Sequence, residues 1–228
     1  MNVSIIIPTL NEASNIARLL EYIRQNAGPQ LLEVLLVDGG STDDTVAIAQ
    51  IKGAQVIHCP TRSRAAQMNL GAKHARGEVL YFIHADTLPP QNFLEAIHTA
   101  LANGLCMGCF RYRFDSSSWL LKCNAWFTRF NFLWCQGGDK TFFILTDTFT
   151  ELGGYDEKYV IMEEYDFIRR ARKKYLMPTL PHTAIVSARK YQQNSWLRVQ
   201  LANLLVFNLF RVGLEPIRLK KIYKQILN

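Results

Sequence analysis

The first half of the chain alternates between short apolar runs and segments whose apolar residues recur at helical spacing. Residues 3–7 are β-branched and apolar, which is typical of a buried parallel strand, and we expect Pro8 to end that strand. Apolar positions from Ile16 to Ile23 then fall on one face of a helix, for which Ser14 is the expected N-cap. The same alternation predicts strands at 31–37, 54–58 and 78–83, and helices at 43–52, 64–75 and after Pro89 and Pro90.

Three clusters of polar residues follow three of these expected strands, at 9–12, 38–41 and 84–86. Repeated β-α-β units imply a mostly parallel sheet with helices on both faces, and ligands bind outside the carboxyl ends of such strands. We therefore expect an α/β fold in which the three polar clusters form one composite site.

The second half of the chain has a different pattern. Residues 107–114 alternate between apolar and basic positions, which predicts an antiparallel strand with one solvated or ligand-facing side. Residues 119–134 are rich in aromatic side chains and predict a helix. Such aromatic stripes usually belong to the core, and an acceptor pocket or a membrane-facing surface is the alternative. Residues 196–212 are amphipathic and lead into a basic tail.

The net charge of the chain is concentrated at its C-terminal end. The 228 residues carry 26 Lys and Arg against 19 Asp and Glu, for a formal net charge of +7. From Ser187 onward, eight basic residues stand against Glu215 alone, so this tail holds the whole excess. A solvated helix, contact with anionic lipid and packing against a second copy in a homodimer all fit such a tail. Nucleic acid does not, because the chain has no recognised binding module.

Composition excludes several other classes of protein. A chain with 49% hydrophobic and 20% charged residues is globular rather than disordered. Its longest apolar stretch, 199–210, is too short to span a bilayer, and the N-terminus lacks the basic region of a signal peptide. The five cysteines lack a complete metal-ligand spacing, which favours buried thiols in a reducing compartment. We expect a cytoplasmic protein that lies at most on the inner face of a membrane.

The first candidate for chemistry is Asp38, at the end of an expected strand and before Gly39 and Gly40. Glycines let a ligand approach the backbone closely, and a carboxylate at this place can accept a hydrogen bond from a ribose or a base. A capped turn without a ligand is the alternative.

The second candidate is the pair His84 and Asp86, two residues apart at the end of an apolar strand. Alternate residues of an extended segment point the same way, so both side chains are expected to converge on one ligand. A carboxylate and an imidazole can bind Mg²⁺ or Mn²⁺ when diphosphate oxygens supply the remaining ligands. Asp86 as the cap of a turn is the alternative.

The third candidate is the acidic start of an expected helix, with Glu163, Glu164 and Asp166 close in sequence. Carboxylates are favoured at a helix N-terminus by the helix dipole, so a structural role is possible for each of them. A functional carboxylate here would serve as a general base.

These motifs, taken in order, resemble family 2 glycosyltransferases, which have the GT-A nucleotide-diphospho-sugar transferase fold. Residues 5–12 (IIIPTLNE) look like that family's opening strand and loop, and 38–45 (DGGSTDDT) like its nucleotide-binding turn. Residues 69–77 are similar to the helix that leads to the metal-binding strand. The acceptor-side motifs are matched by 151–156 (ELGGYD) and 163–167 (EEYDF).

A narrower resemblance rests on three shorter motifs. Residues 64–69 (RAAQMN), 84–87 (HADT) and 187–189 (SAR) resemble a bacterial subgroup often labelled radical-SAM/selenodomain-associated transferase. The resemblance to family 2 covers nearly the whole chain. It implies a nucleotide-binding half at 1–105 and an acceptor-binding half at 106–190 of one domain, with 191–228 as an amphipathic helical tail packed on that domain.

The resemblance implies a role for each residue of the donor pocket. Pro8, Asn11 and Glu12 would hold the base and ribose of the nucleotide, with Glu12 near the ribose hydroxyls. Asp38 would meet uracil or an equivalent base, and Arg64 would border the same pocket. The donor is then a nucleotide-diphosphate sugar, with UDP favoured by family habit.

The resemblance also implies a metal ion and a base. Asp86 would be the last acid of the family's DxD element and bind Mn²⁺ or Mg²⁺, although His84 replaces the expected first acid and could favour Mn²⁺. Glu164 would match the base of the family's Glu-Asp pair and deprotonate the acceptor hydroxyl, with Glu163 as the second choice. The implied outcome is transfer with inversion.

Two further residues are candidates for contact with the acceptor or the diphosphate, namely Asp139 and Arg189. The acceptor class is open, and lipid-linked and small-molecule acceptors both fit. The main alternative from a different class is a catalytically weak, transferase-like module that binds a nucleotide or a partner and docks on a membrane through its basic tail.

Overall fold

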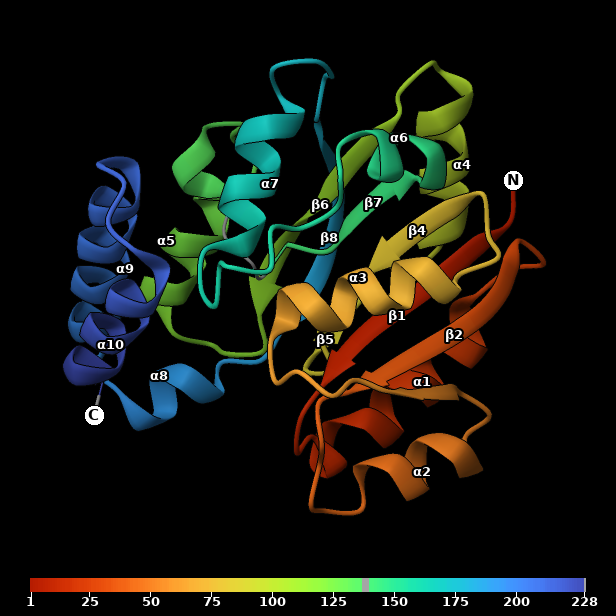
Figure 1. Ribbon diagram of the computed structural model, residues 1–228, viewed down its shortest axis with the longest axis horizontal. Helices are drawn as coiled ribbons and strands as arrows, with labels where there is room; N and C mark the ends of the chain where they lie inside the picture. The colour runs from red at the N-terminus through yellow and green to blue at the C-terminus, as the bar shows by residue number, and fades with distance from the viewer. Residues whose placement is uncertain (137–139, 228) are drawn as a thin grey trace.

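The computed structural model describes residues 1–136 and 140–227, which contain one mixed sheet (Figure 1). Its strands are β1 (Val3–Thr9), β2 (Leu31–Asp38), β3 (Gln55–His58), β4 (Val79–Phe82), β5 (Thr87–Leu88), β6 (Met107–Phe114), β7 (Phe142–Leu145) and β8 (Thr179–Val186). They lie in the order β3-β2-β1-β4-β7-β6-β8-β5. The first four run parallel, β6 and β8 are also parallel, and β7 and β5 are antiparallel to their neighbours. The expected α/β class with a mostly parallel sheet is confirmed.

Helices cover both faces of this sheet (Figure 1). They are α1 (Ala13–Asn26), α2 (Thr45–Ile51), α3 (Arg64–His74), α4 (Phe93–Ala102), α5 (Trp119–Phe127), α6 (Thr146–Glu151), α7 (Glu163–Ala171), α8 (Arg189–Gln193), α9 (Trp196–Arg211) and α10 (Pro216–Leu227), with a 3₁₀ turn η1 (Leu133–Cys135). One apolar cluster joins α1 and α4 to the sheet, and a second joins α3, α6 and α7 to the opposite face. Burial on both faces explains why the central strands are apolar at nearly every position.

The end of β1 differs from the expectation that Pro8 terminates it. Pro8 lies inside the strand, in register with Val37 of β2, and the strand continues to Thr9. The pairing of β1 with β4 on its other side ends at Ile6. Thr9 O accepts from Gly39 N on the β2 side, and backbone groups alternate along a strand, so the nitrogen of Pro8 faces the side where pairing has stopped. No ladder hydrogen bond is lost there.

Two helix expectations also need correction. Ser14 is not the cap of α1, because the helix already begins at Ala13 and Glu12 occupies the N-cap position. The aromatic segment is not one helix: α5 ends at Phe127, and η1 follows after a turn. Its aromatic rings do not enter the core either. The exposed ones are Trp119, Trp126, Phe127, Phe132 and Trp134.

The second half of the sheet contains elements that the sequence pattern did not reveal. β6 is antiparallel to β7, as expected, but it is also parallel to β8 through a register shift between Phe110 and Arg111. Along β6, Phe110 and Phe114 are buried, whereas Arg111 is half-buried and Arg113 is exposed. Residues 107–110 are all buried and Tyr112 is half-buried like Arg111, so the expected alternation holds only at Arg113 and Phe114, and the mixed pairing was not foreseen.

The C-terminal helices α9 and α10 pack against each other and against the segment that leads into α7. Val206, Phe210 and Leu219 are buried in a cluster that includes Tyr159 and Tyr165. The opposite face of α9 is apolar as well but exposed, through Leu197, Leu201, Leu204 and Leu205. Within the described residues, we find no helix long and apolar enough to cross a bilayer.

Candidate active site

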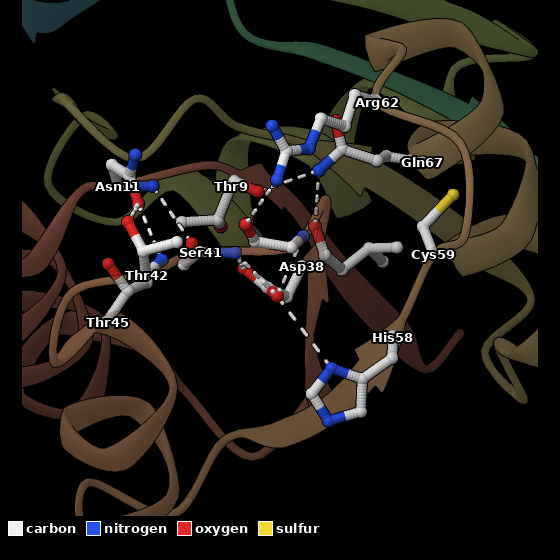
Figure 2. Close-up of polar contacts among 12 residues, drawn as sticks. Thr9, Asn11, Asp38, Ser41, Thr42, Thr45, His58, Cys59, Arg62 and Gln67 are labelled. Carbon is white, nitrogen blue, oxygen red and sulfur yellow. Dashed lines mark hydrogen bonds and ion pairs between the residues drawn. The ribbon is translucent and has the colours of Figure 1, made fainter.

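The carboxyl ends of β1 and β2 are held together by a buried amide from α3. The Nε2 group of Gln67 donates to the carbonyl oxygen of Thr9 at 2.8 Å and to that of Val37 at 2.7 Å. Figure 2 shows Gln67 reaching these two strand ends from the helix. Buried carbonyl groups need such donors, and the two bonds fix the point from which both loops begin.

Asp38 is the last residue of β2, and only 2% of its surface is exposed. Its carboxylate accepts from the backbone N–H of Gly40 at 2.9 Å and from that of Ser41 at 3.0 Å, and Nδ1 of His58 lies 3.7 Å away (Figure 2). Gly40 has a φ of +90°, a conformation that glycine adopts without strain. The carboxylate of Asp38 thus shapes the glycine turn itself.

Asn11 connects the loop after β1 to this turn. Its own φ of 54° lies in the left-handed region, which asparagine tolerates better than most residues. Its N–H donates to Oγ of Ser41 at 2.9 Å, and its side-chain oxygen accepts from the N–H of Thr42 at 2.8 Å (Figure 2). Next to it, the N–H of Glu12 donates to Oγ1 of Thr45 at 2.8 Å. The two loops therefore form one continuous surface.

Arg189 joins this surface to the loop after β4. Its guanidinium lies 2.8 Å from Oε1 of Glu12 and 3.7 Å from Oδ2 of Asp86. The hydrogen bond to Glu12 raises the pKa of Arg189, which stays a cation. Glu12, Asp86 and Arg189 come from distant parts of the sequence and meet at the strand ends, where the polar clusters were expected to gather.

The geometry of the segment from His84 to Asp86 differs from the expectation. β4 ends at Phe82, and the N–H of Thr87 bonds to the carbonyl oxygen of His84, which closes a turn. The two side chains therefore do not alternate along an extended strand. Asp86 faces Arg189, whereas His84 turns toward α7 and contacts Glu164.

His84 and Glu164 form a half-buried ion pair. Nε2 of His84 lies 3.1 Å from Oε1 of Glu164, and the two side chains are 18% and 17% exposed. Burial alone would raise the pKa of Glu164, but the hydrogen bond and charge of His84 hold it below its usual range. Burial likewise opposes the charge on His84, and the bond to Glu164 nevertheless raises its pKa. Glu164 is thus kept ionised inside a pocket.

Glu163 has the opposite electrostatic situation although it is the next residue. It is 4% exposed, and burial together with the neighbouring charge of Glu164 raises its pKa to about 7. A neighbouring pair of carboxylates with pKa values pushed apart is a feature of sites that use acid or base chemistry. Asp166, the next acid along α7, is bound by Arg169 and Arg170 at 2.9 and 2.8 Å and serves the structure of the helix.

A pocket opens beside the pair and runs under α7. Pro8, His84 and Glu164 line it near the strand ends, and Gln136 and Lys140 line it farther along. Its remaining lining residues are Met68, Phe82, Ile83, Cys109, Phe142, Tyr155, Phe167, Ile168 and Met177. Arg64, exposed at the start of α3, is close enough for its charge to lower the pKa of Glu163 and of Glu164, behind the effect of burial.

The candidate residues therefore form two groups. In the first group, Arg189 contacts both Glu12 and Asp86; in the second, His84 contacts Glu164, whose pKa the charge of Arg64 also lowers. Asn11 and Asp38 hold the loops that border the first group. Asp139, the remaining candidate, lies outside the described residues.

The site offers a limited set of metal ligands. Within residues 1–136 and 140–227, no three His, Cys, Asp or Glu side chains come together as a metal-binding cluster. Nε2 of His84 contacts Glu164, and the partly exposed carboxylate of Asp86 lies near the strand ends beside Arg189. A single carboxylate fits a Mg²⁺ or Mn²⁺ ion that takes most of its other ligands from substrate phosphates and water.

Sequence reasoning missed several residues of this region. Gln67 belongs to the motif at 64–69, but the sequence gives no sign that its side chain is buried between two strand ends. Lys140 and Thr179, which meet at 3.0 Å, gave no signal at all, because a single lysine in a sequence is normally read as exposed.

Residues 4–152 match the model of a known family, described as glycosyl transferase family 2. The chain belongs to this family. A relative in Haloferax volcanii, glycosyltransferase AglE, is 37% identical over 100 residues, which cover 41% of this chain and 33% of AglE. The chain spans about a third of the length of the curated relatives that it matches.

Solved structures of glycosyltransferases have the same fold as this family 2 chain. The mannosyltransferase PcManGT from Pyrobaculum calidifontis, in complex with GDP-Man and Mn²⁺, gives a TM-score of 0.71 at 21% identity and covers 99% of this chain and 68% of its own. Residues 1–349 of TarS from S. aureus, in complex with UDP-GlcNAc, give 0.67 at 18% identity and cover 100% and 72%. The expected GT-A fold is confirmed.

Proposed function

We propose that the protein transfers a sugar from a nucleotide-diphosphate sugar to an acceptor hydroxyl, with inversion at the anomeric carbon. The observation that carries this proposal is the ionised Glu164, held by His84 in a pocket that continues from the loops after β1 and β4. Membership of family 2 supports the same class of reaction.

Glu164 is the proposed general base. Oε1 accepts the hydrogen bond from His84, and Oε2 is left to accept the proton of the acceptor hydroxyl. The acceptor oxygen forms a bond to the anomeric carbon while the bond from that carbon to the diphosphate oxygen breaks. The proton goes to Glu164 and the electron pair leaves with the nucleoside diphosphate, so attack from the opposite face inverts the anomeric centre. Glu163, buried and largely protonated at neutral pH, is the weaker candidate.

The donor is proposed to lie over the loops after β1 and β2. Pro8, Asn11, Glu12 and Asp38 lie at these loops and strand ends, and together with Arg64 they are the proposed contacts of the base and ribose. UDP is the favoured nucleotide, and GDP is the alternative to be tested. TarS is described with UDP-GlcNAc and PcManGT with GDP-Man, so both nucleotides occur among proteins of this fold.

Asp86 is the proposed ligand of a divalent ion, Mn²⁺ or Mg²⁺, and Arg189 the proposed cationic contact of the donor diphosphate. When bound, such an ion neutralises negative charge on the departing diphosphate. Arg189 already lies beside Asp86 and Glu12, on the donor side of the site, which favours the diphosphate over the acceptor as its partner. PcManGT, described with Mn²⁺, supports a divalent ion in this fold.

Isothermal titration of UDP and of GDP, each with and without Mn²⁺, tests the donor site. We expect one nucleotide to bind in the presence of Mn²⁺, and Asp86→Ala to remove the dependence on the metal. Asp147→Ala, an exposed acid at the start of α6, is the matched control and should bind as the wild type does. If neither nucleotide binds with either metal, the catalytically weak module that docks on a partner becomes the better description.

A peripheral membrane contact is proposed for the exposed face of α9. Leu197, Leu201, Leu204 and Leu205 form an apolar stripe opposite the buried face of the same helix. The tail around it has a large excess of basic residues, which complements an anionic lipid surface better than a neutral partner. This contact would place the enzyme near lipid-linked acceptors. Membership of the narrower radical-SAM/selenodomain-associated subgroup is a separate prediction.

Flotation with vesicles tests this contact. Wild type should float with vesicles that contain anionic phosphatidylserine and not with neutral phosphatidylcholine. A Leu201→Asp, Leu204→Asp double variant should stay at the bottom of the gradient, whereas Ile51→Asp, at an exposed apolar position on α2, should float. Absence of flotation together with a dimer in solution would assign the stripe to a second copy instead.

A further inference from the structure

The inner end of the pocket contains a buried ammonium group without a carboxylate partner in the described part of the chain. Lys140 is 7% exposed and lines the pocket, and its Nζ donates to Oγ1 of Thr179 at 3.0 Å. The Thr179 hydroxyl is a neutral partner, and no carboxylate of the described residues forms an ion pair with Lys140. Burial of a charge is costly unless an opposite charge compensates it, so this arrangement calls for an explanation.

A neutral hydrogen-bond network connects Lys140 to a second cation. Nε2 of Gln136 donates to Oγ1 of Thr179 at 3.4 Å and to Oδ1 of Asn131 at 2.8 Å. The same Asn131 oxygen accepts from Nη2 of Arg172 at 2.5 Å. The network between Lys140 and Arg172 therefore consists of amides and a hydroxyl, which orient the two cations but do not neutralise them.

A third cation and two thiols complete the surroundings. Burial lowers the pKa of Lys140, and the charges of Arg172 and Arg111 act in the same direction to a smaller extent. Burial also raises the pKa of Cys109 and of Cys135, which keeps both thiols neutral. The cluster thus has an excess of positive charge that its own thiols do not balance.

Two donors of this cluster are also unused. Nε of Arg111 and Nε of Arg172 are buried and have no hydrogen-bond partner among the described residues. A buried donor without an acceptor is destabilising, and arginine side chains with free donors are suited to phosphate or carboxylate oxygens. The unused donors and the uncompensated charge both favour an anion as the missing partner.

We propose that this end of the pocket, at Lys140 and the hydrogen-bond network that connects it to Arg172, binds an anionic group of the acceptor, a phosphate or a carboxylate. The inference rests on the proposed function, because Glu164 lines the same pocket and would face the acceptor hydroxyl while Lys140 holds the anionic group. Neutral sugar acceptors would leave the ammonium group unpaired. Selection of acceptors then follows from charge as well as from shape.

Isothermal titration with inorganic phosphate and, separately, with acetate tests this site directly. Each anion is titrated into protein saturated with UDP and Mn²⁺, at an ionic strength held constant with sodium chloride, so that the donor diphosphate site is already filled. We expect saturable binding of one anion per chain. Tighter phosphate binding would indicate a phosphate ester as the acceptor group, and tighter acetate binding would indicate a carboxylate.

Two variants separate the site from general surface charge. Lys140→Met should weaken anion binding by about tenfold or more, since a charge-assisted hydrogen bond is lost. It should fold well, because it removes a buried charge and keeps an unbranched chain of similar length. Lys173→Gln, at an exposed lysine near the end of α7, is the matched control and should bind the anion as the wild type does.

The outcomes distinguish this inference from the proposed function. Absence of saturable phosphate and acetate binding to the wild type, or equal binding to Lys140→Met, overturns the anion site. If GDP rather than UDP binds to the wild type, the anion titration is carried out with GDP; absence of binding of both nucleotides overturns the donor site, and the anion titration is then repeated without nucleotide. Arg172→Gln provides an independent second variant and should weaken the same anion without reducing the affinity for UDP.

Discussion

His84 and Glu164 lie 80 positions apart in the chain, yet Nε2 of the first is 3.1 Å from Oε1 of the second. The contact joins the turn after β4 to the first turn of α7. His84 stands where an acid was expected from the resemblance to the family's DxD element. Its Nε2 contacts the proposed base, Glu164. A positive or hydrogen-bonding neighbour is what a buried carboxylate needs to remain ionised.

Replacing the proposed base tests the mechanism. Glu164→Gln should lower the rate at which UDP is released from a UDP-sugar by about 10²–10⁴-fold, because an amide cannot accept the proton. Release can be followed with water as the acceptor, for a panel of UDP-sugars. The affinity for UDP should stay within a few-fold of wild type, and a variant that keeps its rate would remove Glu164 from the mechanism.

Replacing its partner separates two roles of His84. His84→Ala should reduce the rate of UDP release, because Glu164 loses the hydrogen bond that keeps it ionised. Titration of UDP in the presence of Mn²⁺ should give nearly the wild-type affinity, since Asp86 is the proposed ligand. A large loss of Mn²⁺-dependent affinity would instead make His84 a metal ligand.

The raised pKa of Glu163 predicts an unusual dependence of stability on pH. Its pKa rises from 4.5 to about 7 on folding, so the folded state holds a proton that the unfolded state has released between these values. Stability attributable to this residue therefore falls as pH rises through that window. Glu163→Gln should have the wild-type melting temperature at pH 4. At pH 8 its melting temperature should be higher, and its free energy of unfolding should exceed that of the wild type by about 3 kcal/mol at most.

Thermal unfolding at several pH values measures this difference. Asp156→Asn, a more exposed acid whose pKa is lowered, is a useful comparison because its effect has the opposite sign. Burial opposes that lowering, while the bonds from Lys158 produce it, and the stability that it contributes is lost as pH falls. Equal melting curves for Glu163→Gln and wild type at pH 8 would contradict the raised pKa.

Asp38 should matter for the fold as much as for the ligand. Asp38→Ala leaves the N–H groups of Gly40 and Ser41 without their acceptor, at a cost of about 1–3 kcal/mol. Thermal unfolding should show the loss in the absence of any nucleotide. Asp44→Ala, at an exposed position in the same loop, is the control and should unfold near the wild-type temperature. An unchanged Asp38→Ala would show that the turn does not depend on the carboxylate.

Much of the parallel half of the fold was predictable, because local pattern and burial agree there. In β1 and β4, every residue is buried, and the run of apolar letters is the direct consequence. β8 was not predictable: it contains Pro181 with exposed neighbours, and its pairing with β6 includes a register shift. Such a strand is defined by its partners rather than by its own composition.

The site divides in the same way. Glu12 and Asp86 both lie near the strand ends, where each contacts Arg189, and this follows from the topology that the sequence pattern predicted. The partner of His84 depends on where α7 docks, which no local pattern contains. The burial of Lys140 goes with its contact to Thr179, at the start of β8 and 39 positions away, so the sequence alone gave no reason to single it out.

The bonds from Gln67 and Asn11 have a thermodynamic consequence for the donor site. They fix the loops after β1 and β2 as part of folding, so the loss of backbone entropy is already included in the stability of the protein. A ligand that arrives at a preorganised surface does not have to order it again, and more of its contact energy appears as affinity. Nucleotide binding should therefore change the amide exchange of these loops very little.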